Sequence, residues 1–332
     1  MRALHAPQAP HVPLLLSLAQ GCLLLLAELL SGTAAWGAAA APVPSASGTA
    51  VAPQVLVERA RAAWARGERA AALELLRPAG LAGYREVQFT LGLMIESLPG
   101  AGHVQFSEAA NWYYRAAQAG HPGAMNNLAV LHHEGRGVPV TLSVARIWYE
   151  RAANAGVAQA QHNLALLYAR GTGVPRDRGR MLYWLERAAA AGHLPSEVEL
   201  GIAYLETEGV PGNPARARQW LEKAAARDDA EAQYRLGLLA LAGAPDTALA
   251  WLRKAGDQAH PQAAWEAARI LEGRQGPGDS EAALDYYRAS ASVGHRPAMQ
   301  RMLRIHSEGG LGEPPNPGLA RFWSLRLQAR PA

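Results

Sequence analysis

Small and apolar residues recur at every fourth position in short stretches that return 36 residues apart. The stretches hold Ala124, Leu128 and His132; Ala160, Leu164 and Tyr168; and Ser196, Leu200 and Tyr204. Side chains spaced i, i+4, i+8 lie on one stripe of an α-helix. The pattern therefore predicts one helix with a narrow packing face in each period.

A second helix in each period is marked by tryptophan. Four tryptophans follow one another at intervals of 36 residues: Trp112, Trp148, Trp184 and Trp220. Each begins a six-residue segment that ends in Arg-Ala-Ala or Lys-Ala-Ala. Self-similarity at a fixed period of about 20 to 50 residues is typical of a solenoid, whose units bury their apolar faces against their neighbours. The chain is therefore expected to form stacked helical hairpins.

Glycine, proline and capping residues separate the predicted helices. The loop after the first helix reads Gly-x-Gly-Val-Pro at 135–139 and at 171–175. Its glycines permit backbone angles that side chains forbid, and its proline stops the preceding helix. Residues suited to N-capping the second helix stand seven positions before three tryptophans: Thr141, Asp177 and Asn213. Glycines predicted to end the second helix in the left-handed conformation are Gly120, Gly156 and Gly192.

This pattern resembles the Sel1-like repeat, a relative of the tetratricopeptide repeat, over roughly residues 84–330. The matching positions include Ala160, Leu164, Tyr168, Gly171, Gly173, Val174, Trp148, Tyr149, Ala152, Ala153 and Gly156. The resemblance implies an all-α fold, a right-handed superhelical solenoid of about eight helical hairpins. It also implies a non-catalytic scaffold that binds another protein, with no cofactor.

The N-terminal segment has the features of a secretory signal peptide. Arg2 precedes an apolar stretch, Leu14–Leu30, and small residues follow it. Glu28 makes this stretch a poor membrane span, because a carboxylate at depth is costly. We therefore expect a signal peptide at residues 1–37, cut between Ala35 and Ala41, and a bacterial protein that is periplasmic or secreted.

Two alternatives for this segment stay open: a retained membrane anchor, and lipid attachment at Cys22, the only cysteine. If the segment is not cut, the membrane would be contacted only through it. A eukaryotic lumenal adaptor would be expected to carry glycosylation sites, and the chain has no Asn-x-Ser/Thr.

The rest of the chain divides into three parts. Residues 38–52 are rich in alanine, proline, serine and glycine and are predicted to be a flexible linker. Residues 53–83 are predicted to form a capping hairpin outside the 36-residue register, and residues 84–330 the repeats. Beyond Asp228 the register loosens, since Trp251 follows Trp220 after only 31 residues.

Composition weighs against nucleic-acid binding. The net charge is +4, and the basic residues form no run along the sequence. Only two lysines occur, Lys223 and Lys254. We expect a monomer with a protein partner.

Histidine is the main candidate for chemistry. Four histidines occupy one place in their repeats, directly after the second helix: His121, His193, His260 and His295. Equivalent positions in neighbouring repeats lie roughly 10 Å apart and cannot share an ion, so a structural role in the turn is favoured. The cluster His132-His133-Glu134 lacks the spacing of a helical zinc motif, and no metal site is predicted.

No nucleophile elbow and no phosphate-binding loop occurs in the sequence, and catalytic residues are not predicted. Cysteine-rich relatives suggest an alternative, a hydrolase of cell-wall or β-lactam substrates. This chain lacks their repeated cysteines.

The predicted binding surface is a row of variable residues on the first helices. One place before the packing residue stand Asn127, Asn163, Glu199, Arg235, Glu266 and Arg301. Seven residues further on, and on the same helical face, stand Glu134, Arg170 and Glu206. In solenoids of this type the first helices line the concave side, where partners bind. We refer to these nine residues as the predicted row.

Overall fold

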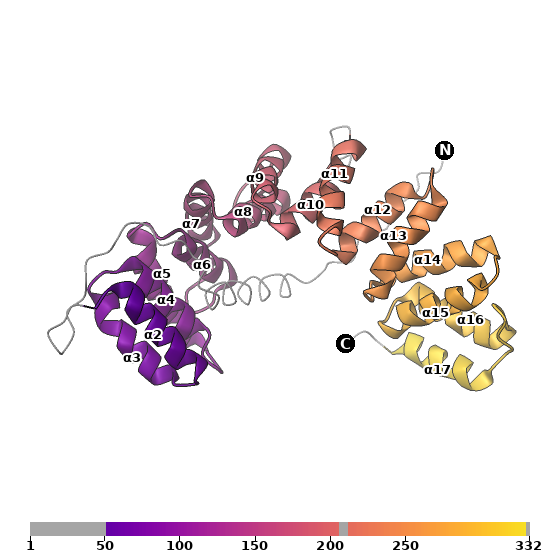
Figure 1. Cartoon of the computed structure of the whole chain (residues 1–332), viewed down its shortest axis with the longest axis horizontal. Coiled ribbons are helices and arrows are strands. Elements are labelled where there is room, and N and C mark those ends of the chain that lie inside the picture. The colour runs from indigo at the N-terminus through magenta and orange to yellow at the C-terminus, as the bar shows by residue number, and fades with distance from the viewer. Residues whose placement is uncertain (1–50, 206–211, 330–332) are drawn as a thin grey trace. The chain divides into compact units, whose positions relative to one another are not determined.

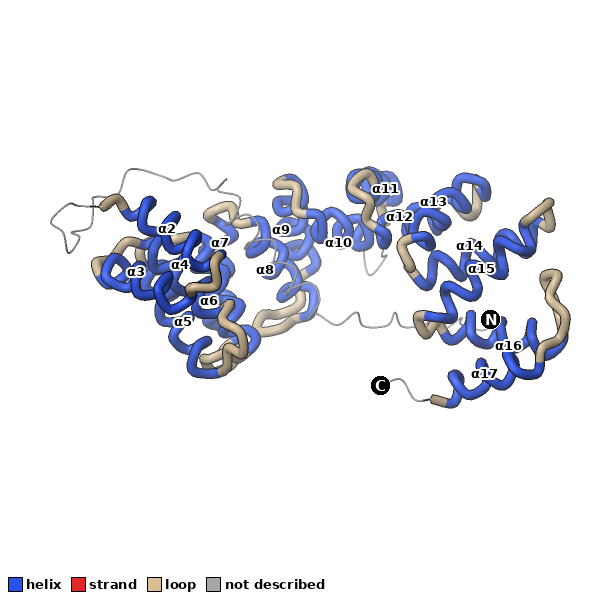
Figure 2. The backbone as a smooth tube through the Cα atoms, turned by 60° about the horizontal axis from the view of Figure 1, so that its bottom comes forward, coloured by secondary structure: helices blue, strands red, loops and turns tan. Residues whose placement is uncertain are grey.

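The computed structural model describes residues 51–205 and 212–329. The predicted signal peptide at 1–37, with Cys22, lies outside the described residues, as does nearly all of the predicted linker at 38–52. The described residues form sixteen α-helices. Figure 2 shows helices and loops but no β-strand among them. Consecutive helices pair as hairpins, so the prediction of an all-α fold of about eight hairpins is confirmed.

The helices fall into two compact units, which meet in sequence at residues 178 and 179 (Figure 1). The first unit contains α2 (Pro53–Ala65), α3 (Arg69–Leu81), α4 (Arg85–Glu96), α5 (His103–Gln118), α6 (Pro122–Glu134), α7 (Leu142–Asn154) and α8 (Ala158–Arg170). The second contains α9 (Arg178–Ala190), α10 (Leu194–Leu205), α11 (Pro214–Ala225), α12 (Ala230–Ala240), α13 (Pro245–Asp257), α14 (Pro261–Arg274), α15 (Asp279–Ser292), α16 (Arg296–Glu308) and α17 (Pro317–Gln328). Apart from α9, the helices pack mainly on the helices next to them in the sequence.

Local signals set the helix ends. The Asn213 side chain accepts a hydrogen bond from the Arg216 amide at 3.0 Å, as an N-cap should. Thr141 is the N-cap residue of α7, but its hydroxyl donates to the Pro139 carbonyl and leaves the helix amides uncapped. The three glycines predicted to be left-handed, Gly120, Gly156 and Gly192, have φ of 82°, 89° and 79°.

Repeat tryptophans Trp112 and Trp148 lie between neighbouring hairpins. Trp112 of α5 lies against α3, where a Cβ added to Gly80 would come within 3.0 Å of the indole. Trp148 of α7 meets the edge of Tyr114 of α5, with ring centroids 6.2 Å apart. Trp112, Trp148, Trp184 and Trp323 are 5–8% exposed. A buried indole removes about 150–250 Å² from water, on the order of 4–6 kcal/mol of gross stabilisation.

A tyrosine of the second helix stands directly after the tryptophan in two hairpins and directly after Tyr286 in a third. Tyr113, Tyr149 and Tyr287 are almost completely buried. The Tyr113 hydroxyl donates to Glu96 at 2.6 Å, and the Tyr287 hydroxyl donates to Glu272 at 2.6 Å. In each case the carboxylate belongs to the first helix of the same hairpin, so the bond fixes the second helix against the first.

Burial of the indole should decide how much each repeat tryptophan stabilises the fold. We expect Trp148→Ala to cost about 3–5 kcal/mol, because it leaves a cavity between α5 and α7. Trp220 is only half-buried, so Trp220→Ala should cost about half as much. Urea unfolding followed by far-UV circular dichroism measures both, and equal losses would contradict packing between hairpins as the source of stability.

Candidate functional site

In the first unit the two asparagines of the predicted row are buried. Asn127 and Asn163 are each 6% exposed, although they occupy equivalent places on α6 and α8. The Asn126 amide donates to the Asn127 oxygen at 3.2 Å, and the Asn163 amide donates to the Asn126 oxygen at 3.4 Å. These bonds tie α6 to α8, and little of either side chain is accessible. A partner-binding role for Asn127 and Asn163 stays a prediction.

Glu134 and Arg170 lie at the ends of α6 and α8. Glu134 pairs with Arg136 at 3.2 Å, and Arg136 also pairs with Glu96 at 3.2 Å. Burial raises the pKa of the Glu96 carboxyl, although its bonds to Tyr113 and Arg136 act in the opposite direction. The Arg170 side chain is exposed.

A crevice of about 20 Å³ in the first unit includes Arg170, His133, Tyr149 and Asn163 in its lining. This is room for about one water molecule. The crevice is too small to hold a ligand side chain in this structure.

In the second unit the predicted row lies at the surface and carries charge. Glu199 is exposed, and Arg235, Glu266 and Arg301 are partly exposed. Three of these residues form ion pairs, Arg235 with Glu231 at 2.6 Å, Glu266 with Arg269 at 3.1 Å, and Arg301 with Glu272. Glu206 lies outside the described residues. The accessible part of the predicted row is therefore made of Glu134 and Arg170 in the first unit and these four residues in the second.

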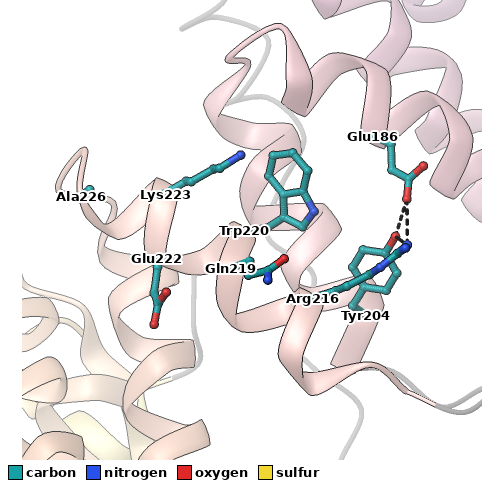
Figure 3. A pocket seen from close by; sticks show the side chains of 8 residues that line it. All are labelled: Glu186, Tyr204, Arg216, Gln219, Trp220, Glu222, Lys223 and Ala226. Atoms are coloured by element: carbon teal, nitrogen blue, oxygen red, sulfur yellow. Dashed lines mark hydrogen bonds and ion pairs between the residues drawn. The ribbon is translucent and has the colours of Figure 1, made fainter.

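A hollow with a volume of about 710 Å³ lies against Trp220. Its other lining residues are Glu186, Tyr204, Arg216, Gln219, Glu222, Lys223 and Ala226. Figure 3 shows Lys223 reaching toward the indole on one side, with Glu186, Tyr204 and Arg216 gathered on the other. The Tyr204 hydroxyl donates to Glu186 and accepts a hydrogen bond from Arg216 at 3.0 Å. We call this the Trp220 hollow.

A second hollow of about 540 Å³ lies one repeat further on and shares Ala226 with the first. Its lining includes Trp251, Lys254, Asp228 and Asp257. Asp228 accepts a hydrogen bond from Gln233 at 2.9 Å, and Asp257 accepts one from Tyr286 at 2.8 Å. We call this the Trp251 hollow.

The two hollows share a feature that distinguishes their repeats from the others. Four repeat tryptophans have an arginine three residues later and are buried, whereas Trp220 and Trp251 have the two lysines and are half-buried. The Lys223 ammonium lies 4.0 Å from the Trp220 ring centroid, and the Lys254 ammonium 4.7 Å from that of Trp251. Neither ammonium has an ion-pair partner among the described residues. Each hollow thus offers a partly open indole and an unpaired cation.

From the sequence alone, the two lysines stand out only because lysine is rare in this chain. Their position three residues after a tryptophan could have indicated an exposed cation–π pair, because residues at i and i+3 lie on one helical face. The exposure of the indole depends on the neighbouring repeat and could not be read from this spacing.

Two of the four repeat histidines cap helices with their side chains, in agreement with the predicted structural role in the turn. The Nδ1 atoms of His121 and His260 accept hydrogen bonds from the amides of Ala124 and Ala263, both at 3.1 Å. His193 Nδ1 lies 2.8 Å from the Ser196 hydroxyl. His295 holds the same N-cap position without a side-chain capping bond.

Burial lowers the pKa of His121 and of His193 to about 4. Near neutral pH both rings are therefore neutral, and Nδ1 of His121 remains free to accept its capping bond.

Among the described residues, no group of three or more His, Cys, Asp or Glu side chains is placed to hold a metal ion. No helix in the described ranges has the length and apolar character needed to cross a membrane.

Seven segments of the chain match the family model described as Sel1 repeat. They are residues 87–121, 122–157, 158–193, 195–229, 230–260, 261–295 and 305–326, well over half of the chain. The predicted capping hairpin at 53–83 forms α2 and α3 and lies before the first matched segment.

Two solved structures are similar to this chain. A Sel1 repeat protein from Oxalobacter formigenes has 27% identity and a TM-score of 0.57, with 67% of this chain and 96% of that chain covered. The protein c5321 of uropathogenic Escherichia coli, described as a protective antigen displaying an SLR fold, has 25% identity and a TM-score of 0.52. That match covers 77% of this chain and 64% of the E. coli protein. No curated protein matches this chain.

Burial of the His121 ring should make stability depend on pH. Its pKa of about 4 lies below the ordinary value of 6.5, so its contribution is complete above pH 6.5 and is lost as pH falls toward 4. We expect a loss of about 1–2 kcal/mol from this group between pH 7 and pH 5. His121→Asn keeps a capping acceptor that does not titrate, and urea midpoints at the two pH values should fall less in this variant. An unchanged pH dependence would contradict the assignment.

Proposed function

The chain belongs to the Sel1 repeat family, and we propose that it is a non-enzymatic scaffold or adaptor for another protein. Proteins built from Sel1 repeats in general serve protein–protein interaction. We place its action in the bacterial cell envelope or outside the cell, because the N-terminal segment has the pattern of a signal peptide.

The observation that carries this proposal is the pair of neighbouring hollows at Trp220 and Trp251. Tryptophan and tyrosine are enriched among the residues that dominate binding energy, because they bury large areas and lose little conformational entropy. A partner side chain that covers either indole would also bring its polar groups to the unpaired ammonium of Lys223 or Lys254. The hollows therefore combine apolar area with charge, as an interface centre does.

The exposed part of the predicted row is the second contact surface of this proposal. Glu199, Arg235, Glu266 and Arg301 present alternating charge on the first helices of the second unit. Charges of this kind act mainly on the choice of partner and on the rate of association, since exposed ion pairs add little net affinity.

The test separates the two surfaces. Crosslinking in the intact envelope followed by mass spectrometry identifies the partner, and titration calorimetry with the purified partner then gives the affinity. We expect Lys223→Glu with Lys254→Glu to weaken binding at least about tenfold. The matched control, Lys223→Arg with Lys254→Arg, keeps both charges and should stay within about threefold of the wild type.

The row is tested in the same assay by Glu199→Arg with Arg235→Glu. If only this variant loses affinity, the partner binds the predicted row and not the two hollows. Unchanged affinity in both variants, with unchanged melting temperatures, would contradict the proposal for both surfaces.

A further inference from the structure

The Trp251 hollow differs from the Trp220 hollow in the charge of its lining. Its charged lining residues are two acids, Asp228 and Asp257, and one base, Lys254. The lining of the Trp220 hollow has as many acids as bases: Glu186, Glu222, Arg216 and Lys223. At neutral pH the lining of the Trp251 hollow is therefore negative overall, whereas the charges around Trp220 balance.

Neutral donors hold both aspartates of the Trp251 hollow in place. The Gln233 side chain donates to one oxygen of Asp228. The Tyr286 hydroxyl donates to one oxygen of Asp257. Among the described residues, neither carboxylate forms an ion pair, and the second oxygen of each accepts no hydrogen bond. Because an amide and a phenol orient a carboxylate without neutralising it, both remain acceptors for a cation.

The indole of Trp251 adds a flat surface for a cation. It is half-buried, and the face of an indole attracts positive charge. The Lys254 ammonium lies 4.7 Å from the ring centroid, but it ends an exposed and flexible side chain. Lys254 can therefore move off the ring without breaking an ion pair.

These features together favour arginine among the side chains of a partner. A guanidinium is planar and always charged, it donates to carboxylates through a fork of N–H groups, and it stacks on aromatic rings. A lysine ammonium is a more strongly hydrated point charge. The volume of the hollow, about 540 Å³, lies within the range of about 300–1,000 Å³ that is typical of binding pockets.

We propose that the partner residue that fills the Trp251 hollow is an arginine. Its guanidinium lies on the Trp251 indole and donates to Asp228 and Asp257. This inference rests on the function proposed above, in which the hollows contact a protein. The lysines of the two hollows are left for acidic groups of the same partner, so the partner segment carries both charges.

The first test uses the full chain and needs no partner. The chain is titrated with N-acetylarginine methylamide, with the matching lysine compound, and with the matching citrulline compound, which has the shape of arginine without its charge. Two-dimensional NMR follows the indole N–H signal of Trp251, assigned by its loss in Trp251→Phe. We expect the arginine compound to shift this signal saturably in the millimolar range. The citrulline compound should bind at least about fivefold more weakly.

Two variants locate the contact. Asp228→Asn with Asp257→Asn removes both charges and keeps the shape of the side chains, and asparagine tolerates the left-handed φ of 65° at Asp228. This variant should bind the arginine compound at least about fivefold more weakly. The matched control is Asp246→Asn, on the same helix as Asp257 but outside the lining of both hollows. It should bind as the wild type does, and melting temperatures confirm that each variant is folded.

The second test repeats the calorimetry with the purified partner. Asp228→Asn with Asp257→Asn should weaken its binding at least about fivefold. The inference is overturned, and the proposed function kept, if the partner loses affinity in the lysine-to-glutamate variant but not in this one. Equal binding of the arginine and citrulline compounds, tighter binding of the lysine compound, or no shift of the Trp251 signal would also overturn the inference alone. A partner that binds both variants normally would overturn the inference together with the role proposed for the hollows.

Discussion

The packing of an indole between neighbouring hairpins is the contact on which the fold depends. No hairpin can bury both of its faces alone, so each relies on the next for its core. Trp112 packs against α3, and Trp148 packs against Tyr114 of α5. In each case one side chain supplies the apolar contact between two hairpins. The capping bond of His121 and the bond from Tyr113 to Glu96 act locally, in hairpins whose position the indole has already set.

Much of the fold could be predicted because its causes are periodic. Tryptophans 36 residues apart, left-handed glycines such as Gly156 and capping residues such as Asn213 each act within a few residues of their own position. The loss of five residues before Trp251 was also visible, and in the structure α13 begins at Pro245, directly after a shortened turn. The structural role of the repeat histidines followed from the same periodicity.

The exposure of the site residues could not be predicted in this way. Asn127 and Glu199 hold equivalent places in the sequence, yet Asn127 is buried and Glu199 is exposed. The difference arises because Asn126, Asn127 and Asn163 are short amides that bond to one another between α6 and α8. A bond between repeats depends on the two side chains that meet, and a periodic pattern describes only one position at a time.

The same dependence on neighbours explains where partners can bind. A repeat that matches its neighbours covers its own indole and offers a partner little apolar area. On the function proposed above, binding surfaces arise where the match is incomplete, at Trp220 and Trp251, where lysine replaces arginine. Partner recognition would then be carried by departures from the repeat pattern, while the pattern itself provides the stability that allows those departures.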